Sequence, residues 1–415
     1  MPSLLLRPIG WLIEWRAAVL LGLATIGAYG VVLYAIGVLV APIEADTGWS
    51  TGALSGAFAI GVLLSGVVAI GAGYALDRAG SRVVFVGALG GGAALLTLAS
   101  LATSAADFIA AWGLGAALVG GGLYYPMTMA TLSRLYPERR AAALSILTLL
   151  GALASPIFYP LAGWLTEAYG WREAMRALVM VMVVLVLPGA LLAGARPALR
   201  PAARVPGPSV RAVLREARVL RLLLAVGLAS AATSALLLHQ VPAMQAAGLT
   251  LTAASGMAGA RGLLQIPGRL VLAQLTSRFG LRGTAVLAYG TGAAGAGALC
   301  LALAGGPPVA LTGVFALTAG LAVGLLSPVH GLLAADAYGE ERLGTLSGVQ
   351  QFVASVAGAA GPWLSGVLVD RTGGYLLPML VPLVALLGAI VVLGGRPGRR
   401  SIEQQTSAIE AGPLP

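Results

Sequence analysis

Long apolar segments alternate with short polar connections along almost the whole chain. Each segment has about 20 or more predominantly apolar residues, the length that crosses the hydrocarbon core of a bilayer as an α-helix. The connections contain most of the arginines and acids. This pattern predicts an all-α membrane protein with twelve transmembrane helices, near residues 17–42, 50–76, 82–102, 107–134, 141–166, 173–194, 219–246, 252–276, 282–304, 308–335, 343–369 and 374–395.

One long polar interruption divides these segments into two sets of six. Residues 196–218 are rich in Pro and Arg, and they separate a predicted N-terminal bundle (1–195) from a predicted C-terminal bundle (219–395). The remaining residues, 396–415, are expected to form a polar tail. Because arginines concentrate in cytoplasmic connections, the Arg-rich linker is assigned to the cytoplasm. Few arginines fall on the opposite side: Arg172, Arg176 and Arg371. We therefore expect a multi-pass protein of the cytoplasmic (inner) membrane with both termini in the cytoplasm.

The composition agrees with a protein surrounded by the lipid bilayer. Hydrophobic residues make up 58% of the chain and charged residues only 10%, whereas soluble domains average about a quarter charged. The net charge of +10 is spread over the connections rather than gathered on one face, so a nucleic-acid partner is not indicated. Cys300 is the only cysteine, which excludes a disulfide framework or a thiolate metal site. No cofactor or metal ion is expected.

The two predicted bundles share sequence at a period of about 200 residues, which indicates an internal repeat. One repeated stretch follows the fourth segment of each set, and it keeps both the order and the spacing of its residues. Tyr136, Glu138, Arg140, Leu144 and Ser145 recur as Tyr338, Glu340, Arg342, Leu346 and Ser347. Such repeats within an apolar chain are typical of transporters built from two pseudo-symmetric halves.

A second repeated stretch follows the second segment of each set. The residues G-x-x-x-D-R-x-G-x-R comprise Gly73, Asp77, Arg78, Gly80 and Arg82. Gly80 permits a tight turn, and Asp77 can pair with Arg82 or with a charge under a neighbouring helix to latch the cytoplasmic side. Ordinary positive-inside loop charges are the alternative. In the second copy Ser277 replaces the acid, so we expect a weaker latch there.

This loop resembles the signature loop of the major facilitator superfamily (MFS), and the two-half pattern resembles the same superfamily over nearly the whole chain. Finer resemblance to the monocarboxylate porter and oxalate/formate antiporter branch is carried by I-G-A-Y-G-V-V-L-Y in the first segment, R-L-Y-P-E-R-R-A-A-A-L-S after the fourth and Y-G-W-R after the fifth. The resemblance implies the MFS fold and transport of a small molecule by alternating access. It does not name the substrate.

Three polar residues in the eighth segment are the leading candidates for substrate binding. Arg261, Gln265 and Arg269 are spaced i, i+4, i+8, so they share one stripe of a helix within about 12 Å. An arginine inside a span is costly unless it faces water, an acid or a ligand. The resemblance implies that this helix lines the central cavity and that Arg269 contacts the substrate anion. For Arg269, snorkelling at the cytoplasmic end is the alternative.

The other candidate binding residues are polar side chains within predicted spans: Tyr34, Tyr124, His239 and Gln350. Tyr34 falls where resembling monocarboxylate porters carry a lysine. Buried tyrosine hydroxyls need partners, which ligand oxygens can supply, although helix packing explains individual tyrosines equally well. His239 can titrate, but a hydrogen-bonded packing histidine is the simpler interpretation.

No Asp or Glu lies in the middle of a predicted span. Proton-coupled carriers usually bind the proton on such a group, so a proton would have to travel on His239 or with the acid itself, and exchange for a counter-anion remains open. We therefore expect a monomeric secondary transporter of a small organic anion, a monocarboxylate, with an exporter of drugs or other metabolites as the alternative. The connections contain no catalytic motif, so an enzyme is not expected.

Overall fold

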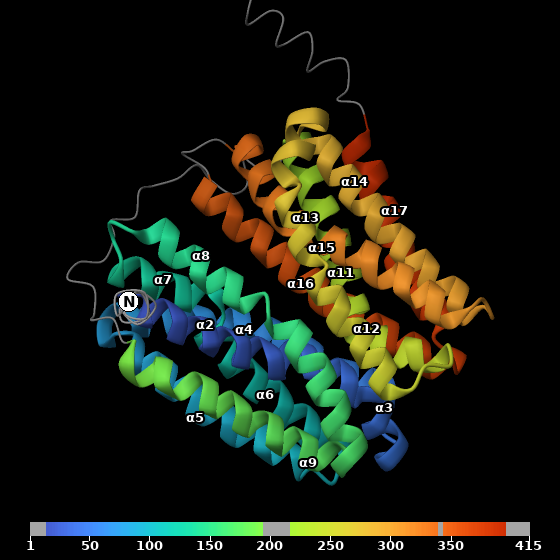
Figure 1. Ribbon diagram of the computed structural model, residues 1–415, viewed down its shortest axis with the longest axis horizontal. Helices are drawn as coiled ribbons and strands as arrows, with labels where there is room; N and C mark the ends of the chain where they lie inside the picture. The colour runs from blue at the N-terminus through green and yellow to red at the C-terminus, as the bar shows by residue number, and fades with distance from the viewer. Residues whose placement is uncertain (1–13, 194–215, 339–342, 396–415) are drawn as a thin grey trace, which may run out of the picture.

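The computed structural model describes residues 14–193, 216–338 and 343–395. Every regular element in these ranges is a helix. The N-terminal half comprises α2 (Arg16–Tyr29), η1 (Gly30–Ala35), α3 (Ile36–Thr47), α4 (Thr51–Ala79), α5 (Ser81–Ser100), α6 (Ala105–Leu123), α7 (Tyr125–Leu135), α8 (Arg140–Gly151) and α9 (Ala154–Leu192). The C-terminal half comprises α11 (Ala217–Ala246), α12 (Leu251–Leu263), α13 (Gln265–Leu270), α14 (Leu272–Leu303), α15 (Pro308–Tyr338), α16 (Leu343–Thr372) and α17 (Leu376–Gly394). Figure 1 shows the halves side by side.

Ten helices within the described ranges are long and apolar enough to cross a membrane. One of them, the nearly continuous stretch of α8 and α9 from Arg140 to Leu192, has 53 residues. This is far too long for a single crossing. Gly170 bends it sharply and divides it into two arms. A further expected span, 252–276, is broken into α12, α13 and the start of α14. The ten helices correspond to the twelve predicted segments only when the two arms are counted separately and the broken pieces are joined as one span.

The internal repeat is visible in the backbone. Gly80 joins α4 to α5 with φ 84° and ψ 170°, and Gly280 bends α14 with φ 68° and ψ 172°. A residue with a Cβ is strained at such a positive φ, so glycine is required at both turns. The two glycines occupy equivalent positions in the two copies of the repeated stretch, residues 73–82 and 273–282. The repeated Glu340 and Arg342, the linker 196–215 and the tail 396–415 lie outside the described residues.

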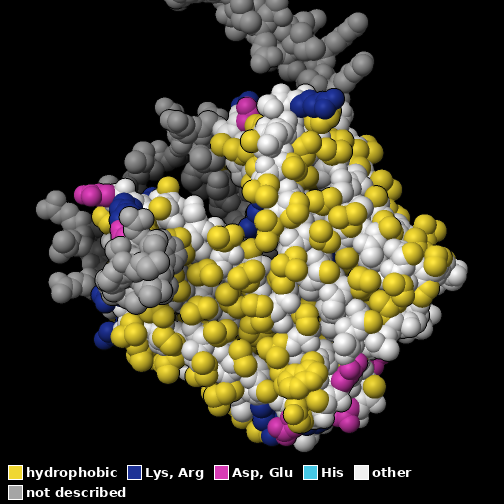
Figure 2. All heavy atoms as spheres, viewed as in Figure 1, with side chains coloured by type: hydrophobic (Ala, Val, Ile, Leu, Met, Phe, Trp, Pro, Cys, Tyr) yellow, Lys and Arg dark blue, Asp and Glu magenta, His cyan; other side chains and the backbone are white. Residues whose placement is uncertain are grey.

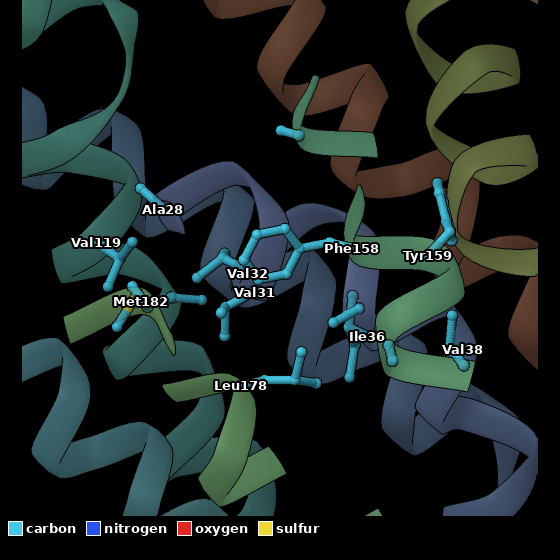
Figure 3. Close-up of a cluster of buried hydrophobic side chains, with 14 of the residues drawn as sticks. Ala28, Val31, Val32, Ile36, Val38, Val119, Phe158, Tyr159, Leu178 and Met182 are labelled. Carbon is cyan, nitrogen blue, oxygen red and sulfur yellow. The ribbon is translucent and has the colours of Figure 1, made fainter. Parts of the chain in front are cut away.

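Small residues let the helices of the N-terminal half pack closely around η1. Figure 3 shows Val31 and Val32 of this π-helical turn among buried side chains of α6 and α9, including Val119, Phe158 and Met182. A Cβ on Gly30 would lie 2.2 Å from the Phe158 ring. Glycine is therefore needed where the first span crosses α9. π-Helical turns are frequent at functional sites, and Tyr34 lies in this one.

The two halves are joined at one end of the molecule, which we call the sealed end. Hydrogen bonds there run from Gly52 N–H to Asp370 (3.0 Å) and from Thr252 N–H to Glu167 (2.9 Å). The opposite end, which we call the open end, contains the turns at Gly80 and Gly280; there α7 and α8 lie apart from α15 and α16 in Figure 1. Figure 2 shows a broad hydrophobic belt with charged side chains gathered at the two ends, as expected for a protein in a bilayer.

Candidate functional site

A central cavity of about 410 Å³ lies between the two halves. Its walls come from η1, α4 and α6 on one side and from α11, α12, α13, α15 and α16 on the other. Towards the open end it adjoins a second hollow of about 440 Å³, and both are lined by Ser230, Thr233, Val323, Gln351 and Ala354. The cavity is therefore placed at the interface between the halves and continues along the C-terminal half towards the open end.

Arg261 is the one arginine among the residues lining this cavity, and it is only 2% exposed. It lies about 15 Å along the helix from Leu251 at the sealed end, near the middle of the membrane. Its Nε has no hydrogen-bond partner, and no carboxylate of the described residues forms an ion pair with it. It interacts electrostatically with Tyr34 and Tyr159. A buried guanidinium with an unpaired Nε–H and no acid beside it has the chemistry to bind an anion.

The helix that presents Arg261 is interrupted immediately after it. Leu264 ends α12 with ψ −5°, and Pro267 lies inside the short α13. Proline has no N–H to donate to the preceding turn, which explains the break. Two glycines of α15, Gly320 and Gly324, allow the broken helix to pack closely against it. A Cβ on Gly324 would lie 2.2 Å from the Gln265 carbonyl oxygen, and a Cβ on Gly320 would lie 2.6 Å from the Arg261 carbonyl oxygen. The side chains at 261 and 265 are thus fixed by backbone-to-backbone packing.

Tyrosines from the N-terminal half cover the cavity opposite Arg261. Tyr34 comes from η1 and Tyr124 from the junction of α6 and α7, and both line the cavity. Tyr124 stacks on Tyr29 with ring centroids 4.0 Å apart, and Tyr34 lies 5.5 Å from Tyr159. The Tyr159 hydroxyl donates to the Leu237 carbonyl (3.0 Å) and accepts from Gln240 Nε2 (2.5 Å). This network reaches from α9 to α11 and positions the aromatic rings around the guanidinium.

The structure brings together four of the seven predicted binding residues: Tyr34, Tyr124, Arg261 and Gln265 line the same cavity. The other three lie elsewhere. Arg269 is exposed, outside the residues that line the cavity, although it interacts electrostatically with Tyr34. Gln350 lines the adjoining hollow and accepts from the Tyr338 hydroxyl (3.2 Å). His239 is fully buried at the sealed end.

Several cavity residues were not singled out from the sequence. They are small hydroxyl-bearing side chains on α11 and α16, which look unremarkable within apolar segments: Ser230, Thr233, Ser234 and Ser355. Their spacing was the available signal, because positions i, i+3 and i+4 share one helix face. Tyr159 was missed as well, since its role depends on contacts between the two halves that the sequence does not reveal.

The two walls of the cavity differ in chemistry. The wall from the C-terminal half is predominantly polar, with Arg261, Gln265 and Gln351 beside the hydroxyl groups of α11 and α16. The wall from the N-terminal half is mostly apolar, apart from the two tyrosines and Ser65, whose hydroxyl donates to the Val62 carbonyl (2.7 Å). The cavity therefore suits a molecule with one charged or polar end and one apolar face.

The predicted latch residues lie at the open end and make contacts within the N-terminal half. Asp77 forms an ion pair with Arg134 of α7 rather than with Arg82. Arg82 donates to the Leu191 carbonyl (2.5 Å), and Arg78 lies over the Tyr74 ring at 3.8 Å. Gly73 lies four residues before Asp77 in α4.

In the second copy the loop lacks such an ion pair among the described residues. Ser277 donates instead to the Gln274 carbonyl of its own helix (2.9 Å). The substitution of the acid by serine therefore removes the contact to a neighbouring helix.

Comparisons with known proteins agree with this architecture. Residues 21–362 match the Major Facilitator Superfamily. Monocarboxylate transporter 13 of Bos taurus is 30% identical over 302 residues, which cover 72% of this chain and 69% of that protein.

Solved structures share the fold at low sequence identity. A point mutant of the nucleoside transporter NupG superposes with a TM-score of 0.76 at 14% identity and covers 91% of this chain and 97% of its own. A bacterial homologue of the human lysosomal transporter Spinster, in an inward-facing and unoccupied conformation, gives 0.68 at 15% identity, covering 91% and 96%. From the sequence match and the shared fold we conclude that the chain belongs to the Major Facilitator Superfamily and lies near its monocarboxylate transporters.

Proposed function

We propose that this protein is a secondary transporter that moves a small monocarboxylate across the cytoplasmic membrane by alternating access. The observation that carries the proposal is Arg261, a cation that is 2% exposed in the central cavity with no acid to neutralise it among the described residues. A carboxylate would neutralise it when the substrate binds. The similarity to monocarboxylate transporter 13 supports the same class of substrate.

The cavity supplies a distinct place for each end of such a substrate. The guanidinium fork offers parallel N–H donors that match the two oxygens of a carboxylate. Gln265 and the hydroxyl groups of α11 and α16 can donate further hydrogen bonds on the same wall. Apolar side chains of the N-terminal half, among them Val32, Phe58 and Val62, face the tail. The carboxylate must leave Arg261 before transport is complete. Movement of the two halves can weaken the contact between the carboxylate and Arg261 and so release the acid.

The orientation follows from the arginines and from the two ends of the structure. The open end contains Arg78, Arg82, Arg134 and Arg278, whereas the sealed end contains Arg172 and Asp46 in an ion pair (2.5 Å). By the distribution of positive charge, the open end faces the cytoplasm and the sealed end faces outwards. The described conformation is accordingly one in which the substrate exchanges with the cytoplasm.

The test measures carboxylate binding by the purified protein and by variants of Arg261. Acetate, pyruvate, butyrate and phenylacetate are titrated against wild type, Arg261→Lys and Arg261→Gln, with thermal unfolding followed in parallel. Losing a charge-assisted, bidentate contact should weaken binding by about tenfold or more in either variant. Arg218→Lys is the matched control, since Arg218 is exposed and pairs with Glu216 outside the cavity.

Two outcomes would contradict the proposal. If both Arg261 variants fold and bind these acids like wild type, the carboxylate is not held by Arg261. If wild type binds none of the acids while drug-like cations or neutral metabolites stabilise it, the exporter interpretation replaces this one.

A further inference from the structure

The sealed end is built from two corners that the internal repeat makes nearly identical. In one corner the N-terminus of α4 meets α16, and in the other the N-terminus of α12 meets α9. Ser50 and Thr250 cap their helices by accepting from Ala53 N–H and Ala253 N–H, both at 3.2 Å. A carboxylate from the other half then binds the next free N–H of each helix: Asp370 binds Gly52, and Glu167 binds Thr252. Acids at helix N-termini are favourable, so these contacts stabilise the closed corner.

The resemblance extends one turn further into each helix. Ser55 and Ser255 are both fully buried and pack against glycines of the opposite half. A Cβ on Gly366 would lie 2.4 Å from Ser55 Oγ, and one on Gly163 would lie 2.6 Å from Ser255 Oγ. The two corners therefore repeat the cap, the carboxylate and the serine–glycine contact.

His239 breaks this symmetry. It projects from α11 into the first corner, where Nε2 lies 3.3 Å from Ser55 Oγ and 2.9 Å from the Pro362 carbonyl oxygen. In the second corner Ser255 Oγ has no hydrogen-bond partner among the described residues. Both corners are tightly packed and capped, so closing the sealed end does not itself require a histidine. A residue that is present in only one of two equivalent corners indicates an additional role.

The contacts of His239 define its protonation state in the closed corner. A carbonyl oxygen only accepts, so Nε2 carries the proton and Nδ1 is the unprotonated nitrogen. Nδ1 is buried and has no partner within the described part of the chain. A second proton would therefore place a cation and an unsatisfied N–H donor in a site that water does not reach, which is strongly unfavourable.

The groups around His239 show how the corner would respond. The His239 ring contacts Ser55 of α4 and the Pro362 carbonyl of α16. It also interacts electrostatically with Asp370 of α16. Tyr375, next to α17, has its ring 6.1 Å away. Glu44 of α3 accepts from the Thr51 hydroxyl (2.7 Å) at the start of α4. A charged imidazole attracts Asp370, the carboxylate that caps Gly52, and so competes directly with the contact that closes the corner.

We propose that His239 is a proton-binding site whose protonation opens the sealed end, so that proton binding is coupled to the transport cycle. The proposal rests on the proposed function only in requiring that the sealed end opens during transport; it does not depend on which substrate is carried. The proton comes from the solution outside the sealed end and is retained by the imidazole as the corner separates and Nδ1–H meets water.

The experiment measures opening directly and uses no substrate. The lone cysteine is removed by Cys300→Ser, and spin labels are attached at Thr103→Cys and Ala246→Cys, two exposed positions at the sealed end on opposite halves. Distances between the labels are measured in lipid nanodiscs at about pH 8 and about pH 5, the range in which histidine titrates. We expect the longer-distance population to rise severalfold at the lower pH.

The chain supplies a matched control because it contains only two histidines. His330 belongs to the C-terminal half alone, where it bonds to the Tyr289 hydroxyl (2.8 Å). His239→Gln keeps a neutral donor for the Pro362 carbonyl and should abolish the pH-dependent change, whereas His330→Gln should retain it. The same change in His239→Gln as in wild type would overturn the proposal, as would its loss only in His330→Gln.

A second measurement covers the case in which His239→Gln does not fold. In untagged His330→Gln protein, isotope-labelled histidine gives the NMR signal of His239 alone. Its protonation should follow the same pH dependence as the opening measured by the labels. A ring that stays neutral throughout this range while the labels separate would overturn the proposal.

Discussion

The chemistry of this cavity depends on a few residues, and the one whose burial in the membrane costs the most free energy, Arg261, is recognisable in the sequence. An arginine within an apolar segment is conspicuous, so Arg261 could be predicted as a site residue before any contact was known. Its companion Tyr159 could not, because the hydroxyl gains its role only when α9 approaches Gln240 across the interface. His239 was recognised as a titratable group, but its isolation from the cavity is a tertiary property.

Removing the Tyr159 hydroxyl should weaken both stability and substrate binding. In Tyr159→Phe, Gln240 and the Leu237 carbonyl each lose one hydrogen bond and keep only the 3.3 Å contact between them, which should cost about 1–3 kcal/mol in the free energy of unfolding. Binding of monocarboxylates should fall by several-fold because Arg261 loses a neighbouring dipole. Tyr289→Phe is the control: its hydroxyl bonds to His330, and neither residue lines the central cavity around Arg261, so it should alter thermal stability without altering binding. Equal binding losses in both variants would contradict this role for Tyr159.

The two arginines of the eighth span should differ in their response to salt. Arg269 is exposed, so it can attract an anion only through a field that salt screens within about 10 Å. Arg269→Gln should slow carboxylate association at low ionic strength and have little effect at high ionic strength. The loss caused by Arg261→Gln should persist at both, because that site is buried. Association rates measured across a salt series distinguish the two, and a salt-independent defect in Arg269→Gln would place it in direct contact with the substrate.

At the scale of the helices, hydropathy predicted the positions of the spans but not their irregularities. The expected segment 219–246 lies within α11, and 50–76 begins one residue before α4 and otherwise lies within it, since length and apolar character decide which residues enter the bilayer. The π-helical turn Gly30–Ala35 depends on the packing of Phe158 against Gly30, and contacts of this kind are not encoded in local pattern. Pro267 is a local signal for an interruption of the eighth span, yet the resulting offset between α12 and α13 follows from their packing on α15.

Restoring the missing backbone donor should repair the broken helix. Pro267→Ala supplies a backbone N–H and removes the proline ring that clashes with the preceding turn of the helix. The span should become straighter, and the free energy of unfolding should rise by up to about 3 kcal/mol. Arg261 would then leave its present position, and transport should fall although the protein unfolds at a higher temperature. Uptake into proteoliposomes and thermal unfolding measure the two effects. Improved stability with unchanged transport would show that the break has no part in the cycle.

The latch at the open end should affect transport more than stability. Asp77 is half exposed in its ion pair with Arg134, with side-chain exposures of 49% and 28%, so losing the pair should cost less than about 1 kcal/mol. Asp77→Asn should insert and unfold much like wild type but turn over more slowly, because Arg134 helps to position α7 beside α4. A change in substrate affinity alone, with turnover unaltered, would contradict a conformational role.

For the whole molecule, the repeat in the sequence anticipated two equivalent halves, and the matched turns at Gly80 and Gly280 agree with it. The sequence does not indicate which end is sealed. A transporter that works by alternating access must populate one conformation open at each end, and the free-energy difference between the two conformations is small. The symmetric corners around Asp370 and Glu167 were likewise hidden, since each joins residues from different halves.

The unequal walls of the cavity have a consequence for how new specificities could arise. In the proposed binding mode, the charged head of the substrate contacts residues of the C-terminal half, and its tail contacts mainly those of the N-terminal half. Gene segments encoding the halves can therefore diverge, or be exchanged between relatives, along separate lines. A recombinant protein that keeps residues 219–395 and receives its first six helices from a relative would inherit the acid requirement from one parent and the size preference from the other.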